Sequence, residues 1–296
     1  MKKKEIFRGT ASALITPFRD GEIDYPSLYS IIDMQIGAGI DALVIGGTTG
    51  EAATLDEDER YELYSRAAEH IGGRTRLIFG TGTNDTRCAI RHTRRAEKIG
   101  CDAVLVVTPY YNKGTDEGLI SHYMAIADSA ESPLILYNVP SRTGVNLSMP
   151  QLRRLAEHPN IAAIKEATDS VERLVDIATL GDSLALYSGN DSQIYPTLAL
   201  GGLGVISVIS NLLPKETSDV CRLYFNGQYR ESRLAAERLL PIIRAMFIET
   251  NPAPIKYAMS RLGLCSPELR LPLSPPSEKS RGIIDRLVAE FLDKGN

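Results

Sequence analysis

The chain has 296 residues, of which 43% are hydrophobic and 24% charged. This is the composition of an ordinary globular protein, and it excludes a largely disordered chain. The formal net charge of -4 excludes the strongly basic surface that binds nucleic acids, so we expect no nucleic-acid partner. No stretch approaches the roughly 20 apolar residues of a membrane helix, so we expect no membrane partner.

The N-terminus begins with basic residues, but Glu5, Arg8 and Ser12 interrupt the apolar run that a signal peptide would need. The cysteines form no CxxC pair and are not spaced with the histidines as metal ligands. We therefore expect a cytoplasmic protein without a metal site. The four cysteines, which we expect to be reduced, are Cys88, Cys101, Cys221 and Cys265.

Eight short runs rich in Val, Ile, Leu and Ala recur along the chain. They are almost continuously apolar, which is typical of strands buried on both faces of a parallel sheet. Each run is too short for a typical helix. The predicted strands span residues 13–16, 42–46, 77–80, 103–108, 134–138, 162–165, 184–188 and 204–208.

Segments with helical periodicity lie between these strands. Several begin with helix start signals, such as the acidic residues 56–59 and Pro150 close after Ser148. Strands that alternate with helices predict a parallel sheet, and eight such units favour a closed (β/α)8 barrel. The predicted helices span residues 25–38, 56–71, 86–99, 119–130, 149–158, 171–180 and 192–200.

The chain after the eighth strand has more helical segments than one barrel helix requires. These segments span residues 216–225, 230–247, 254–262 and 283–292, and a Pro-rich connector at 271–276 precedes the last of them. We therefore predict a barrel over residues 1–226. Residues 227–296 would form a C-terminal helical extension that packs on the barrel and does not fold independently.

Lys165 is the most informative residue, because it ends an otherwise apolar predicted strand. In a barrel enzyme the active site lies at this end of the strands. Burial disfavours the charged ammonium and favours the free amine, which can attack a carbonyl. An ion pair with Glu166 is the alternative, but adjacent residues on a strand face opposite sides.

Other predicted strand ends carry groups that suit a small anionic substrate. Residues 46–51, Gly-Gly-Thr-Thr-Gly-Glu, can direct backbone N–H groups at a carboxylate, although a simple tight turn has the same glycines. Tyr137 and Tyr111 can relay protons, and Arg142 can bind a second carboxylate. Taken singly, such tyrosines more often pack in the core, and such an arginine more often lies on the surface.

Seven motifs distributed along nearly the whole chain together resemble one known family. They identify the chain as similar to the dihydrodipicolinate synthase and N-acetylneuraminate lyase superfamily of class I aldolases, and most closely to its dihydrodipicolinate synthase (4-hydroxy-tetrahydrodipicolinate synthase) branch. The motifs are GTTGEAATL from Gly47, VTPYYNKGTDEGL from Val107, LYNVPSRTG from Leu136, IKEAT from Ile164, YSGND from Tyr187, GGLGVISV from Gly201 and ETNPAPIKYAM from Glu249.

The resemblance implies a lyase that condenses pyruvate with aspartate 4-semialdehyde to 4-hydroxy-tetrahydrodipicolinate, in lysine and diaminopimelate biosynthesis. Pyruvate would form a covalent Schiff base on Lys165, so no cofactor is implied. The resemblance also implies a homotetramer made of two tight dimers, in which Tyr111 reaches the active site of the neighbouring subunit.

The resemblance assigns roles to further residues at the motif positions. Tyr137, Thr48 and Tyr111 would form a proton relay. Thr49 and the Thr48 backbone would hold the carboxylate of pyruvate. The remaining substrate-binding residues would be Arg142 for the carboxylate of the aldehyde, with Gly189 and the Ile206 carbonyl lining the pocket.

The chain departs from the family at the feedback site for lysine. Asn84 and Tyr110 match the lysine-inhibited members. Four other positions, where Ser, His, His and Glu are expected, differ, and we therefore predict weak or absent inhibition by lysine. These positions are Ala52, Glu57, Arg60 and Cys88.

Two alternatives remain open. Another pyruvate-dependent aldolase of the superfamily, such as a neuraminate lyase or a 2-keto-3-deoxy-sugar-acid aldolase, would share Lys165 but use a different acceptor. Arg142 favours a short aldehyde with a carboxylate over a polyhydroxylated sugar acid. A non-catalytic binding barrel is the second alternative, and the combination of Lys165, Tyr137, Tyr111 and Thr48 weakens it.

Overall fold

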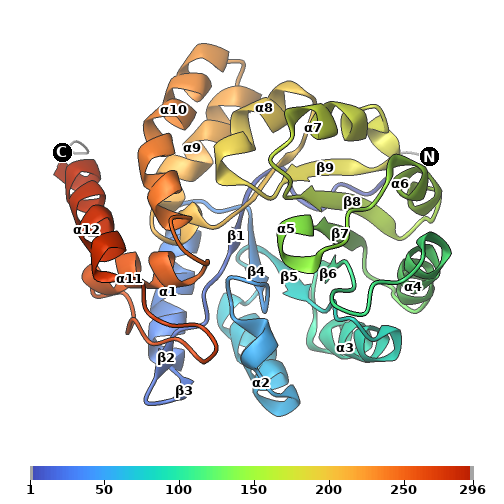
Figure 1. Ribbon diagram of the computed structural model, residues 1–296, viewed down its shortest axis with the longest axis horizontal. Helices are drawn as coiled ribbons and strands as arrows, with labels where there is room; N and C mark the ends of the chain where they lie inside the picture. The colour runs from blue at the N-terminus through green and yellow to red at the C-terminus, as the bar shows by residue number, and fades with distance from the viewer. Residues whose placement is uncertain (1–2, 294–296) are drawn as a thin grey trace.

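The computed structural model describes residues 3–293. Eight parallel strands form a closed barrel in the order β1-β10-β9-β8-β7-β6-β5-β4, with helices around it (Figure 1). The predicted (β/α)8 barrel is thus confirmed. The barrel strands are β1 Gly9–Ala13, β4 Ala42–Ile45, β5 Arg76–Gly80, β6 Ala103–Val107, β7 Leu134–Asn138, β8 Ile161–Glu166, β9 Ala185–Ser188 and β10 Gly204–Ser207.

Only the first strand was predicted in the wrong place. The expected strand at 13–16 overlaps the observed β1 by one residue. The five residues of β1, GTASA, are small and two of them are polar, so they lack the apolar signal, yet all five are buried. The apolar Leu14 and Ile15, which suggested the strand, instead join the hydrophobic cluster that includes the surrounding helices.

Alternate residues of the strands face two separate hydrophobic clusters, as the period of two requires. The smaller cluster takes residues such as Val44, Ile135 and Ala163, and fills the inside of the barrel. The larger cluster contains residues such as Leu43, Leu136 and Ile164, together with helix residues. Lys165 lies two positions after Ala163, so it shares the inner face of β8.

The helices that cover the barrel mostly begin and end within a few residues of the predicted bounds. The acidic start of α2 forms a capping box between Asp56 and Glu59, and Ser148 with Gln151 does the same for α6. These helices are α1 Tyr25–Gly37, α2 Glu57–Ile71, α3 Thr86–Ile99, α4 Asp116–Asp128, α6 Met149–Ala156, α7 Val171–Ala178, α8 Ile194–Ala199 and α9 Pro214–Phe225.

Two small elements were not predicted. A two-stranded sheet of β2 Phe18–Arg19 and β3 Glu22–Ile23 follows β1, and the one-turn helix α5 Pro140–Thr143 follows β7. Each element spans about one period of its pattern, and hydrophobic periodicity is visible only when the pattern repeats. The helix matters for function, because it contains Arg142.

The C-terminal extension contains α10 Tyr229–Met246, α11 Ala253–Arg261 and α12 Glu278–Asp293. These helices lie along one side of the barrel, and α12 packs against α10 and α11 (Figure 1). The proposed boundary between residues 226 and 227 falls in the turn between α9 and α10. Within residues 3–293 no helix is long and apolar enough to cross a membrane.

Candidate active site

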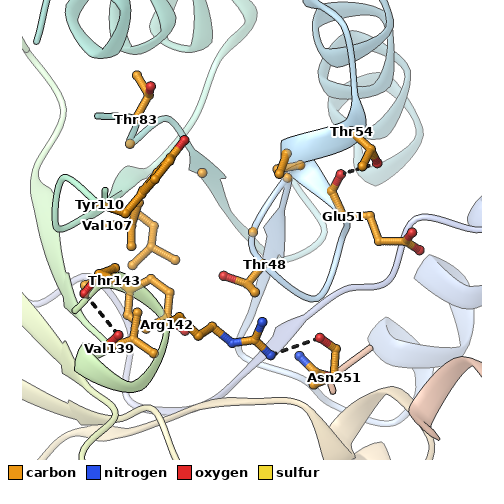
Figure 2. A pocket seen from close by; sticks show the side chains of 18 of the residues that line it. Thr48, Glu51, Thr54, Thr83, Val107, Tyr110, Val139, Arg142, Thr143 and Asn251 are labelled. Carbon is orange, nitrogen blue, oxygen red and sulfur yellow. Dashed lines mark hydrogen bonds between the residues drawn. The ribbon is translucent and has the colours of Figure 1, made fainter. Parts of the chain in front are cut away.

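A cavity of about 440 Å³ opens at the carboxyl ends of the barrel strands (Figure 2). Its wall comes from the loops after β4, β5, β6 and β7, and from two stretches of the C-terminal extension. The expected active-site end of the barrel is therefore hollow. The polar and aromatic side chains in the wall include Thr48, Glu51, Thr54, Arg60, Thr83, His92, Tyr110, Tyr137, Arg142, Thr143 and Asn251.

Lys165 is buried on the inner face of β8, with 5% of its surface exposed. It is the register partner of Tyr137 on β7 and of Tyr187 on β9. Its Nζ lies 4.3 Å from the centre of the Tyr137 ring. Lys165 is not itself in the cavity wall, but Tyr137 is, so the amine lies next to the wall and behind an aromatic ring.

Glu166 faces the other side of β8, as the alternation along a strand predicts. Its carboxylate accepts hydrogen bonds from Asn138 Nδ2 at 3.0 Å and from the backbone of Thr168 at 3.1 Å. It also lies 3.4 Å from Arg173 Nε. Burial raises the pKa of Glu166, and Asn138 and Arg173 oppose that shift. The alternative in which Glu166 neutralises Lys165 is therefore wrong.

Asp191 is a buried acidic residue that the sequence reasoning missed. It follows β9, and its Oδ2 accepts hydrogen bonds from the backbone N–H groups of Val208 at 3.1 Å and Ile209 at 3.0 Å. Burial raises the pKa of Asp191, while these bonds, the Ser207 side chain and the charge of Lys165 oppose the shift. The carboxylate thus fixes the residues that directly follow β10 and lies within electrostatic reach of Lys165.

The loop after β4 is a tight turn built on glycine. Gly46 has a φ of +69°, and a Cβ at this position would lie 2.3 Å from the Tyr64 hydroxyl oxygen, so a larger residue does not fit. The turn brings Thr48 into the cavity wall. Thr49 is buried, and its hydroxyl accepts a hydrogen bond from Asn251 Nδ2 at 3.0 Å.

A buried ion pair connects this loop to the C-terminal extension. Lys256 on α11 is fully buried, and its Nζ donates to Glu51 Oε1 at 2.7 Å and to the Thr16 carbonyl at 2.9 Å. The other Glu51 oxygen accepts from the backbone N–H of Arg270 at 3.0 Å. Burial lowers the pKa of Lys256, and the Glu51 carboxylate opposes that shift. No feature of the sequence alone pointed to this pair.

Arg142 extends from α5 across the cavity toward the C-terminal extension (Figure 2). Its Nη2 donates to the Asn251 carbonyl at 2.9 Å. This single bond fixes one edge of the guanidinium group, which has five N–H donors in total. The group is therefore held in place and retains donors for an anionic ligand.

Tyr111, Gly189 and Ile206, like Lys165 and Thr49, are not in the wall of the cavity of the single chain. Tyr111 has a positive φ of 70° and is 90% exposed, while its neighbour Tyr110 is in the cavity wall. Gly189 lies against β8, where its N–H donates to the Glu166 carbonyl at 2.6 Å. Ile206 is fully buried on β10.

The chain is similar over almost its whole length to proteins of one family. The model of the dihydrodipicolinate synthetase family matches residues 6–290. The 4-hydroxy-tetrahydrodipicolinate synthase of Pelobacter propionicus is 46% identical over 97% of this chain and 99% of its own. The corresponding protein of Clostridium novyi is 44% identical over 97% of each chain.

A solved structure shows the same fold. The crystal structure of dihydrodipicolinate synthase from Thermotoga maritima superposes with a TM-score of 0.95 at 41% identity, covering 97% of this chain and 99% of that one. The match therefore includes the barrel, the cavity and the C-terminal extension. From the buried strand-end lysine, the motifs around it and these likenesses it follows that the chain belongs to the dihydrodipicolinate synthetase family.

Proposed function

We propose that this protein condenses pyruvate with aspartate 4-semialdehyde to 4-hydroxy-tetrahydrodipicolinate, the compound for which its relatives are named. The observation that carries the proposal is the buried Lys165 amine beside Tyr137, at the end of the barrel where the cavity opens. A lysine amine forms a Schiff base by attacking a carbonyl carbon, and this position places the amine next to the space that a small 2-oxo acid would occupy.

In the proposed reaction, the Lys165 nitrogen attacks the pyruvate carbonyl carbon, and loss of water leaves an imine. Loss of a methyl proton converts the imine into an enamine, whose carbon attacks the aldehyde carbon of the second substrate. The amino group of that substrate then attacks the imine carbon, closes the ring and releases Lys165. No electrons leave or enter the reactants, so the reaction requires no redox cofactor.

Proton transfer accompanies each of these steps, and the proposed relay consists of Tyr137, Thr48 and Tyr111. Tyr137 and Thr48 both line the cavity, and Tyr137 contacts Lys165 through its ring. A chain of hydroxyl groups can carry a proton to and from the carbinolamine oxygen, because each hydroxyl both donates and accepts.

Each substrate carries a carboxylate, and the proposal assigns one binding position to each. The turn with Thr49 and the Thr48 backbone N–H would hold pyruvate, with Gly189 and the Ile206 carbonyl completing that part of the pocket. Arg142 would hold the carboxylate of the aldehyde. Its place in the cavity wall and its remaining N–H donors support this role.

The third member of the proposed relay, Tyr111, is exposed and is not in the cavity wall of its own chain. We infer that it enters the site of a neighbouring subunit in a tight dimer, within a homotetramer in the cytoplasm. Its aromatic side chain is exposed and its backbone has a positive φ. Backbone strain of this kind clusters at functional positions, which supports the inference. Sedimentation of the parent and of Tyr111→Ala measures the oligomeric state. Recovery of activity when Tyr111→Ala subunits are mixed with other inactive subunits tests whether the tyrosine acts in the neighbouring site.

Incubation with pyruvate and borohydride tests the covalent step directly. Reduction of the imine should add the mass of a reduced pyruvate unit to one peptide, the one that contains Lys165. An unmodified Lys165 would contradict the proposal and favour a non-catalytic barrel. A panel of aldehydes then identifies the acceptor, and Arg142→Ala should reduce turnover of aspartate 4-semialdehyde more than that of a sugar-derived aldehyde.

A further inference from the structure

Asn251 lies between α10 and α11, outside the eight barrel units, yet it lines the cavity together with Thr48 and Arg142 (Figure 2). Only 5% of its surface is exposed. Its place in the cavity wall means that the C-terminal extension forms part of the candidate site.

Two hydrogen bonds join Asn251 to the two positions that are proposed to bind carboxylates. Its side-chain Nδ2 donates to the Thr49 hydroxyl at 3.0 Å, and its backbone carbonyl accepts from Arg142 Nη2 at 2.9 Å. Thr49 follows β4 and Arg142 follows β7, so these residues belong to separate barrel loops. Asn251 is therefore a bridge between the two loops.

The side chain of Asn251 is not explained by stability alone. Its Oδ1 is buried and has no hydrogen-bond partner among residues 3–293. A hydroxyl both donates and accepts, so either end of the amide can bond Thr49, and one amide atom is left over in each case. A buried polar atom without a partner is unfavourable by about 1–3 kcal/mol, which a small apolar side chain would avoid.

We propose that Asn251 is a positioning residue, which holds the Thr49 hydroxyl and the Arg142 guanidinium at a fixed separation matched to the two substrates. This inference rests on the proposed function. The bond to Thr49 depends on the side chain, whereas the bond to Arg142 depends on the backbone that the side chain anchors. Loss of the amide should therefore weaken pyruvate binding directly and aldehyde binding indirectly.

The test compares the parent protein with Asn251→Ala and with the isosteric Asn251→Asp. The pyruvate concentration that gives half-maximal borohydride trapping should rise about 3- to 10-fold in Asn251→Ala, as expected for one lost hydrogen bond. The KM for aspartate 4-semialdehyde should rise as well, with a smaller change in kcat. Asn251→Asp keeps the volume but places a negative charge beside two carboxylate positions, so it should bind both substrates at least as weakly as the alanine variant.

Glu249→Gln is the matched control, because Glu249 belongs to the same segment but bonds Ser277 instead of the cavity. It should keep the parent values. The melting temperature of Asn251→Ala should stay close to that of the parent, since a purely structural residue would lower the melting temperature and leave the half-saturating concentrations unchanged. That second pattern would overturn the inference.

Thr49→Val tests the same hydrogen bond from its other end, and it can be measured even if Asn251→Ala is poorly folded. It removes the hydroxyl that Asn251 bonds, and should by itself raise the half-saturating pyruvate concentration. In this background Asn251→Ala should add little, and a full additional rise would overturn the inference. If the parent traps pyruvate and Asn251→Ala gives the same half-saturating concentration, only the role of Asn251 is refuted. A parent that traps no pyruvate refutes the proposed function, and this inference with it.

Discussion

The Lys165 amine lies 4.3 Å from the centre of the Tyr137 ring, and the two residues are register partners on β8 and β7. The ring covers one side of the amine and places the phenol in the cavity wall, where a substrate would enter. The proposed nucleophile and the proposed proton carrier are therefore fixed relative to each other by strand pairing and not by a loop.

Replacement of the amine should abolish the reaction. Lys165→Ala should lower kcat at least about 10,000-fold, as the loss of a covalent nucleophile does elsewhere. Borohydride should trap no pyruvate on the variant, and a steady-state assay with both substrates measures the loss of turnover. Turnover of Lys165→Ala near the parent rate would be incompatible with the proposed chemistry.

Tyr137→Phe separates the ring from the hydroxyl. The ring should still cover Lys165, so the half-saturating pyruvate concentration should change little. Without the phenol, kcat should fall about 100-fold, which is the lower range for loss of a general acid–base group. Equal kcat values for the variant and the parent, measured with both substrates saturating, would remove Tyr137 from the relay.

The buried ion pair between Lys256 and Glu51 predicts a large effect on stability. Lys256→Met leaves a carboxylate buried without its partner, and should lower the free energy of unfolding by about 3–5 kcal/mol in urea denaturation. The double variant with Glu51→Gln removes both charges and should recover most of that loss. If Lys256→Met and the double variant are equally unstable, the unpaired carboxylate is not the cause of the lost stability.

Two buried histidines predict a loss of stability in acid. Burial lowers the pKa of His92 and of His122 from 6.5 to about 4. Between these values the unfolded chain binds protons that the folded chain does not, so the free energy of unfolding should fall as the pH is lowered from 6.5 to 4. His122→Gln should reduce this dependence, measured as urea midpoints at several pH values. An unchanged slope would show that His122 does not contribute.

Lysine should inhibit the protein weakly or not at all. Arg60 donates to the Ala52 carbonyl at 2.6 Å and lines the same cavity as Tyr110. A positive charge at this position should disfavour a cationic ligand. Cys88 supplies no carboxylate in compensation. An initial-rate assay with millimolar lysine measures the effect, and strong partial inhibition would contradict this prediction.

The parts of the molecule that follow from local pattern were predictable. Lys165 and Tyr137 end strongly apolar runs, and strand ends meet at one rim of a barrel, so their proximity could be expected before any coordinates. The first strand could not be located, because the small residues of GTASA lack the apolar signal. The short helix that contains Arg142 has only four residues, so its helical pattern does not repeat.

The contacts of the C-terminal extension lay beyond sequence reasoning for a different reason. Asn251 meets Thr49 across 202 residues of chain, and Lys256 meets Glu51 across 205. No periodicity links positions so far apart, and each side chain has many conceivable partners. Asp191 was overlooked because one acidic residue after a strand is common, and only the folded barrel brings its charge near Lys165.

The long separation of Glu51 and Lys256 along the chain has a consequence for when the site is completed during synthesis. The ribosome delivers Glu51 early and Lys256 only after all eight barrel strands have been synthesised. Until then the carboxylate has no cation to accompany it into the interior, so the turn with Thr48 and Thr49 cannot settle in its final form. The rim of the candidate active site is thus completed by a segment that emerges after all the barrel strands, and a nascent chain that ends before α11 should remain inactive even with every strand present.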